Sequence, residues 1–97
     1  MAEVRLSVVG DVAFCRSLGH DPVSIVDQMD SGVREAIAGD ILLVNFECAM
    51  RDDVPEELIK ENLLAMVGPT SGGQALKRMG VTLASLANTH SLDGGVE

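Results

Sequence analysis

The sequence predicts an α/β protein, with a mostly parallel sheet of about four strands and helices packed on it. Four apolar runs have the length of strands and lack a clean polar alternation, at residues 4–9, 41–46, 63–67 and 81–87. Such runs are typical of strands buried on both faces. Helix signals lie between the runs, and strands that alternate with helices form right-handed βαβ units.

The first helical segment spans residues 22–38. It follows the start signal Asp21-Pro22, and its apolar positions step by three or four residues: Val26, Met29, Val33 and Ile37. The stretch "DSG" at 30–32 offers a break that would divide the segment into two short helices. Both versions place helix between the first and second strands.

A second helix is predicted over residues 70–79. Thr70 or Ser71 would cap its start, basic residues occupy its last turn, and Gly80 would stop it. One or two helical turns are also expected within "VPEELIKEN", residues 54–62. These helices complete the alternation that defines the α/β class.

Length and composition indicate a single partial domain over residues 1–97. The chain has 97 residues, of which 46% are hydrophobic and 23% charged, as in soluble globular proteins. Its net charge of -8 would repel phosphate backbones, which argues against nucleic-acid binding. We expect no membrane contact, because no apolar segment approaches the roughly 18 residues of a membrane span. Together with the lack of a signal peptide, this predicts a cytoplasmic location.

The two cysteines, Cys15 and Cys48, are far apart in the sequence and form no CxxC pair. A disulfide framework or a zinc knuckle therefore has no support. We expect two reduced, mostly buried thiols.

Polar side chains follow three of the predicted strands. Asp11 follows Gly10 at the end of the first strand. Asn45 and Glu47 lie at the end of the second strand, and Asn88 and His90 at the end of the fourth. Carboxyl ends of parallel strands meet at one edge, where ligands bind. A spacing of two residues places both members of each pair on one side of an extended backbone. The resulting oxygen and nitrogen donors suit manganese, iron or zinc.

Each of these groups also has a structural reading. Gly-Asp is a common turn, and an Asn with a nearby His suits an ordinary strand end. In that account the side chains of Asp11, Glu47, Asn88 and His90 would be scattered, with no shared cleft. The sequence leaves both readings open.

Three motifs together resemble the N-terminal part of the CapA family, the capsule and poly-gamma-glutamate synthesis proteins. They are "VVGDVAFCR", "AGDILLVNFEC" and "ALKRMGVTLASLANTHSLDGG", and they cover nearly the whole chain. The family pattern is a Gly-Asp strand end with a later Arg, an Asn-x-Glu strand end, and a "SLANNH" strand end followed by Asp and Gly. The positions that match it are Asp11, Arg16, Asn45, Glu47, Asn88, His90, Asp93 and Gly95.

The resemblance implies a metallophosphoesterase-like fold, a four-layer α/β/β/α sandwich of which this chain supplies the N-terminal half. It also implies a metal-dependent hydrolase site of the dinuclear type, with Asp11, Glu47 and Asn88 as metal ligands. His90 would be the catalytic residue and act on the substrate. Supporting or substrate-contacting roles would fall to the remaining polar matches, Arg16, Asn45 and Asp93.

The chain departs from the pattern in two respects. Metallophosphoesterases usually pair the first Asp with a His two residues on, and that position is Ala13 here. Family members also continue for roughly one further domain, which brings His-containing motifs from a second sheet. The site is therefore expected to be incomplete and one sheet face uncovered, which would favour a homo-oligomer or a partner chain. The two functional readings are hydrolysis of an anionic polymer or phosphoester, and non-catalytic binding of a partner chain or an anion.

Overall fold

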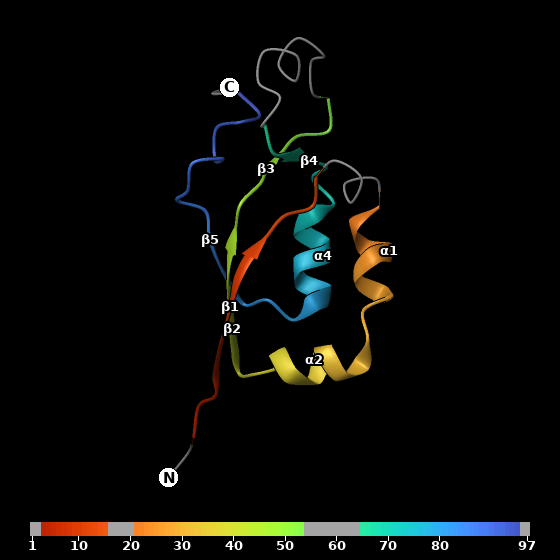
Figure 1. The fold of residues 1–97 in the computed structure, drawn as a ribbon, viewed down its shortest axis with the longest axis vertical. Coiled ribbons are helices and arrows are strands. Elements are labelled where there is room, and N and C mark those ends of the chain that lie inside the picture. The colour runs from red at the N-terminus through yellow and green to blue at the C-terminus, as the bar shows by residue number, and fades with distance from the viewer. Residues whose placement is uncertain (1–2, 16–20, 54–64, 96–97) are drawn as a thin grey trace.

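The computed structural model describes residues 3–15, 21–53 and 65–95 of the chain. Its main sheet has three parallel strands in the order β1-β2-β5, where β1 is Leu6–Val12, β2 is Ile41–Phe46 and β5 is Leu83–Ser85 (Figure 1). Helices lie between these strands in the chain, so the predicted α/β class is confirmed.

A second, two-stranded parallel sheet pairs β3 (Ala49–Met50) with β4 (Val67–Gly68). Of the described residues 65–67 in the predicted strand at 63–67, only Val67 belongs to a strand, and this strand is outside the main sheet. Residues 63–64 lie outside the described ranges. Gly68 lies close to Phe14, since an added Cβ would stand 1.7 Å from the Phe14 carbonyl oxygen. Among the described residues, a three-stranded and a two-stranded sheet therefore stand where a single sheet of about four strands was expected.

The first helical segment is two helices, α1 (Pro22–Asp27) and α2 (Ser31–Ile37). Asp21 caps α1 by accepting from Ser24 N, and Asp30 caps α2 by accepting from Gly32 N. Asp30 has an extended backbone, with ψ at 137°, so the helix cannot continue through it. The divided alternative is confirmed.

The second predicted helix is α4 (Gly72–Met79), and it ends as expected. Gly80 adopts φ 90°, the left-handed conformation that favours glycine at a helix C-terminus. Ser71 occupies the N-cap position but makes no side-chain cap, while Thr70 is bonded to Asp52 instead. The helical turns expected at 54–62 lie outside the described residues.

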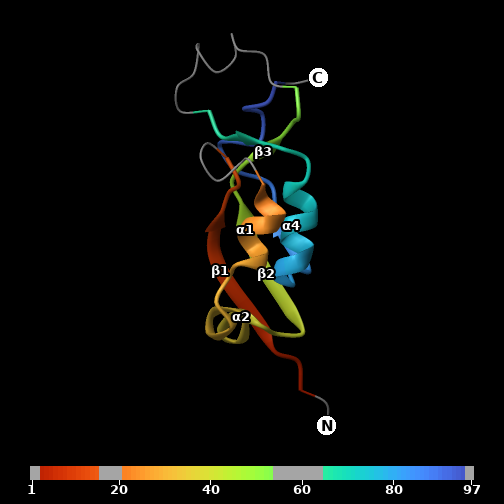
Figure 2. The ribbon, with the colours of Figure 1, turned by 90° about the vertical axis from the view of Figure 1, so that its right-hand side faces the viewer.

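The main sheet has one covered and one open face. Helices α1 and α4 lie side by side on the covered face (Figures 1 and 2), over a core that includes Leu42, Val44 and Phe46 of β2. The open face exposes 64% of Val8 and 55% of Leu83. Burial on both faces is thus wrong for the described part of the chain, where β2 alternates between buried and half-buried residues.

Within the described residues, this open face matches the expectation of one uncovered sheet face. None of the helices within the described ranges has the length and apolarity that a membrane crossing requires.

Candidate functional site

A bulge in β1 brings Asp11 to the open face. Val8 pairs with Leu43 and Asp11 with Asn45, so three steps along β1 correspond to two along β2. In regular pairing Asp11 would follow the alternation to the helix-covered face, because side chains alternate along a strand. The extra residue in β1 shifts the alternation by one, so Asp11 points to the open face instead. Asp11 is therefore part of β1, and its carboxylate reaches the side of the sheet that Asn45 occupies.

Asn45 links the two carboxylates of the predicted site. Its Nδ2 donates to Asp11 Oδ1 at 2.9 Å and to Glu47 Oε1 at 2.9 Å. Both oxygens bond the same nitrogen, so they must lie closer together than twice that distance. Asp11 is exposed, whereas Asn45 and Glu47 are half-buried. The amide N–H groups lie between the two acids and offset part of their mutual repulsion.

Asn88 fastens the following segment to β2. Its Nδ2 donates to the Phe46 carbonyl oxygen at 2.8 Å and to Asn45 Oδ1 at 3.3 Å. Its Oδ1 accepts from His90 N at 3.0 Å. Four predicted site residues, Asp11, Asn45, Glu47 and Asn88, therefore form one hydrogen-bonded group.

Residues 88–94 form a run of bends and turns, and we name this run together with Gly95 the His90 turn. An extended backbone from Asn88 to His90 was the wrong expectation, because the Asn88 side chain bonds the backbone N–H two residues on. That local bond competes with extension and closes an Asx-type turn. Asn88 consequently points to β2 while His90 points to a different partner.

The partner of His90 is Asp93. His90 Nδ1 lies 2.6 Å from Asp93 Oδ2, and the His90 and Asp93 side chains are 25% and 12% exposed. The same carboxylate oxygen accepts from Met66 N at 2.7 Å. Partial burial acts to raise the pKa of Asp93, but the hydrogen bonds from Met66 and His90 outweigh it and lower the pKa. Asp93 is therefore ionised near neutral pH and accepts from Nδ1–H, which directs His90 to contact other groups through Nε2.

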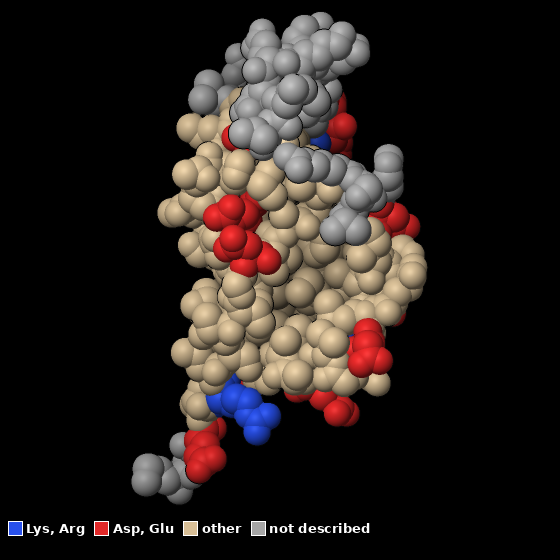
Figure 3. Space-filling model, in the orientation of Figure 1, with Lys and Arg blue, Asp and Glu red and all other residues tan. Residues whose placement is uncertain are grey.

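Acidic side chains gather over the carboxyl ends of β1 and β2 in the space-filling view (Figure 3). Within the described ranges, no three His, Cys, Asp or Glu side chains converge on one point. The donors that do converge are carboxylate and amide groups, a set that suits hard cations better than zinc. Asp11 and Glu47 are thus compatible with a cation whose remaining ligands are amide oxygens or water.

Two further residues bear on the candidate site. Arg16, a predicted site residue, lies outside the described residues. Ser85 was not predicted as a site residue, yet β5 places it in register with Asn45, in the row that also holds Asp11. Only the parallel register between β2 and β5 could have revealed it.

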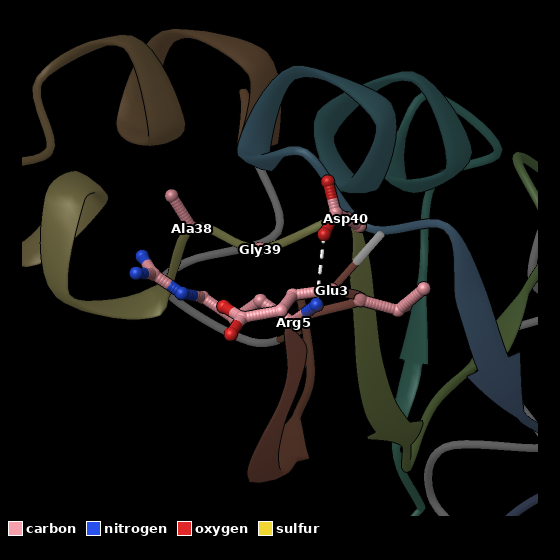
Figure 4. Close-up of a pocket in the computed structure, with 6 residues that line it drawn as sticks. Glu3, Arg5, Ala38, Gly39 and Asp40 are labelled. Atoms are coloured by element: carbon pink, nitrogen blue, oxygen red, sulfur yellow. Dashed lines mark hydrogen bonds between the residues drawn. The ribbon is translucent and has the colours of Figure 1, made fainter. Parts of the chain in front are cut away.

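A separate hollow of about 460 Å³ lies at the amino ends of β1 and β2 (Figure 4). Asp40 accepts from Arg5 N at 2.8 Å, and Ala38 and Gly39 line the same hollow. Parallel α/β proteins bind ligands at the opposite, carboxyl ends of their strands. We therefore place the candidate site with Asn45 rather than here.

The fold and the site define a parallel α/β protein with carboxylate, amide and imidazole groups at the carboxyl edge of its sheet. The family model described as bacterial capsule synthesis protein PGA_cap matches residues 5–97. The chain therefore belongs to this family, as its motifs predicted. Comparisons with curated proteins and with solved structures gave no match.

Proposed function

We propose that this chain supplies the N-terminal part of a metal-dependent phosphoesterase-like site that acts on an anionic polymer or phosphoester. The observation that carries the proposal is the hydrogen-bonded group of Asp11, Asn45, Glu47 and Asn88, beside the His90–Asp93 pair. Membership of a capsule synthesis family supports a substrate related to capsule polymers, of which poly-gamma-glutamate is the member we propose.

A divalent cation would be held by Asp11 and Glu47, with Asn88 as an amide ligand. Asn88 Oδ1 already accepts from His90 N, but a carbonyl oxygen has a second lone pair for a cation. Because oxygen donors dominate, manganese is the first candidate, before iron or zinc. Such a cation would supply positive charge to an anionic group of the substrate.

His90 would contact the substrate through Nε2, because Nδ1 is bonded to Asp93. An imidazole held in this way can donate a proton to a leaving oxygen or hydrogen-bond the transferred group. Asp93 would fix the ring orientation. Asn45 would hold the carboxylates of Asp11 and Glu47 in place.

Metal titration and hydrolysis assays test the proposal. We expect the purified chain to bind Mn²⁺, and Glu47→Gln to weaken that binding by roughly tenfold or more. His90→Gln should keep Mn²⁺ affinity within about twofold but lower hydrolysis of bis(p-nitrophenyl) phosphate by roughly 10²-fold or more. Glu35→Gln, at an exposed position of α2, is the matched control.

The proposal fails if the wild-type chain binds no Mn²⁺ in calorimetry. It also fails if Glu35→Gln reduces affinity as much as Glu47→Gln does. Metal binding without hydrolysis would restrict the chain to the non-catalytic alternative, which Ala13 in place of a metal-binding His also favours.

A second candidate function is non-catalytic association through the open face of the sheet. Val8, Leu43 and Leu83 form one row across the three strands, and Val8 and Leu83 are more than half exposed. Apolar faces of this kind mark interaction surfaces. We propose that a second copy of the chain or a partner chain covers this row.

Sedimentation velocity tests the homo-oligomer form of this idea. Wild-type protein should associate with rising concentration, and Val8→Lys should weaken association. Val33→Lys, at a 48% exposed position on α2, should not. A wild-type chain that stays monomeric at high concentration would count against a second copy.

A further inference from the structure

The His90 turn rests on the small β3–β4 sheet through two hydrogen bonds. Met66, just before β4, donates from its backbone N to Asp93 Oδ2 at 2.7 Å. Arg51, just after β3, donates from Nη1 to the Gly94 carbonyl oxygen at 2.8 Å. The two bonds come from neighbouring strands and flank the sheet, so they hold the turn at two separate points.

Arg51 is well placed to act as a rigid support. Its backbone N donates to the Gly68 carbonyl oxygen at 2.8 Å, and its Nε donates to Asp53 Oδ1 at 3.1 Å. The guanidinium group is planar, so donation to Asp53 helps to orient Nη1. Gly94 lies directly over β3, because a Cβ added there would meet the Cβ of Ala49 at 3.4 Å.

A hollow of about 420 Å³ adjoins the same contact. It is lined by β3, by Arg51 and by Ser91, Gly94 and Gly95 of the His90 turn. Packing against Ala49 thus covers only part of this side of the turn. Hydrogen bonds therefore help to fix the position of the turn.

We propose that Arg51 is a positioning residue for His90. By holding the Gly94 carbonyl, Arg51 fixes the backbone next to Asp93, and Asp93 in turn holds His90 Nδ1. Arg51 acts through the turn rather than on the substrate. The functional meaning of this role rests on the proposed function, in which His90 contacts the substrate.

The ring ¹⁵N signals of His90 provide a readout that a merely structural role would not move. In ¹⁵N-labelled wild-type protein, at a pH where the ring is neutral, we expect the Nδ1–H tautomer to dominate because Asp93 accepts from Nδ1. Loss of the Arg51 contact in Arg51→Met should change the tautomer ratio roughly three- to tenfold, the range of one hydrogen bond. Arg51→Lys should restore part of the wild-type ratio, since Lys can still donate one bond.

Arg34→Met is the matched control, because Arg34 also donates to a backbone carbonyl, that of Arg78, at 3.0 Å. It should leave the His90 signals unchanged. His90→Gln assigns the signals, and urea unfolding verifies that each variant is folded. The proposal is overturned if folded Arg51→Met keeps the wild-type ratio, or if Arg34→Met changes it equally. No metal or substrate enters this measurement, so its failure is distinct from failure of the hydrolase proposal.

Discussion

Asn45 and Asp11 are joined side chain to side chain across two paired strands, with Nδ2 to Oδ1 at 2.9 Å. Because the same nitrogen also serves Glu47, Asn45 separates two acids that would otherwise face each other. Removal of its donors should therefore affect both stability and cation binding.

We expect Asn45→Asp to be destabilising at neutral pH, by about 1–3 kcal/mol in unfolding free energy. A third carboxylate would replace a donor between two acids, and like charges repel. This loss of unfolding free energy should be smaller in acid, where repulsion between carboxylates is weaker, and smaller on addition of Mn²⁺. Urea unfolding with and without Mn²⁺ measures both effects. Gln74→Glu, on exposed α4 surface, adds the same charge as a control, and an equal loss in that variant would contradict the prediction.

The ionised form of Asp93 should contribute stability that depends on pH. Its folded pKa is lowered, against the opposing effect of burial, by hydrogen bonds from Met66 and His90. A lowered folded pKa adds stability above the unfolded value of about 3.9, and this stability is lost as pH falls through the folded value. The difference in unfolding free energy between wild type and Asp93→Asn should therefore be larger at pH 7 than at pH 3. A difference that is constant over this range would argue against an ionised, hydrogen-bonded Asp93.

The two faces of the sheet predict opposite outcomes for the same substitution. Leu42 is 1% exposed against the helices, whereas Leu83 is 55% exposed on the open face. Leu42→Ala should cost about 2–5 kcal/mol, because it leaves a cavity in the core. At concentrations where the chain is monomeric, Leu83→Ala should stay within about 0.5 kcal/mol of wild type. Comparable losses in thermal or urea unfolding would mean that the open face is covered in solution.

The two thiols should differ in reactivity. Burial raises the pKa of the Cys48 thiol, whereas Cys15 is only half-buried. Less thiolate forms at Cys48 at a given pH, and the thiolate is the reactive form. Iodoacetamide should therefore modify Cys15 first in the folded protein, and both residues at similar rates in urea. Peptide mass spectrometry distinguishes the two sites, and faster modification of Cys48 in folded protein would refute this order.

The sequence alone predicted that Asn45, Glu47 and Asn88 lie at one edge of the sheet, because parallel strands align their carboxyl ends. Capping chemistry likewise predicted the stop at Gly80, and the stretch 30–32 offered the break that the structure shows at Asp30, since both depend on local backbone preferences. The helix break and the helix stop depend on neighbouring residues, so they can be predicted without knowledge of distant contacts.

Other features depend on contacts between distant segments. The β3–β4 pair has two residues in each strand, too few for any periodic signal. The hydrogen bond between Arg51 and Gly94 joins residues 43 positions apart, and no local sequence pattern near either residue predicts it. The turn at Asn88 was missed because its side chain can either cap the local backbone or point from a strand, and the fold decides between them.

The bulge between Val8 and Asp11 gives β1 one residue more than the stretch of β2 with which it pairs. Nothing lies within 4 Å of where a Cβ at Gly10 would stand, so side chains of many sizes would fit there. Deletion of that one residue would leave two steps along β1 for two along β2, and Asp11 would still lie opposite Asn45 on the open face. Relatives that lack this residue, or that carry another side chain there, can therefore keep the site.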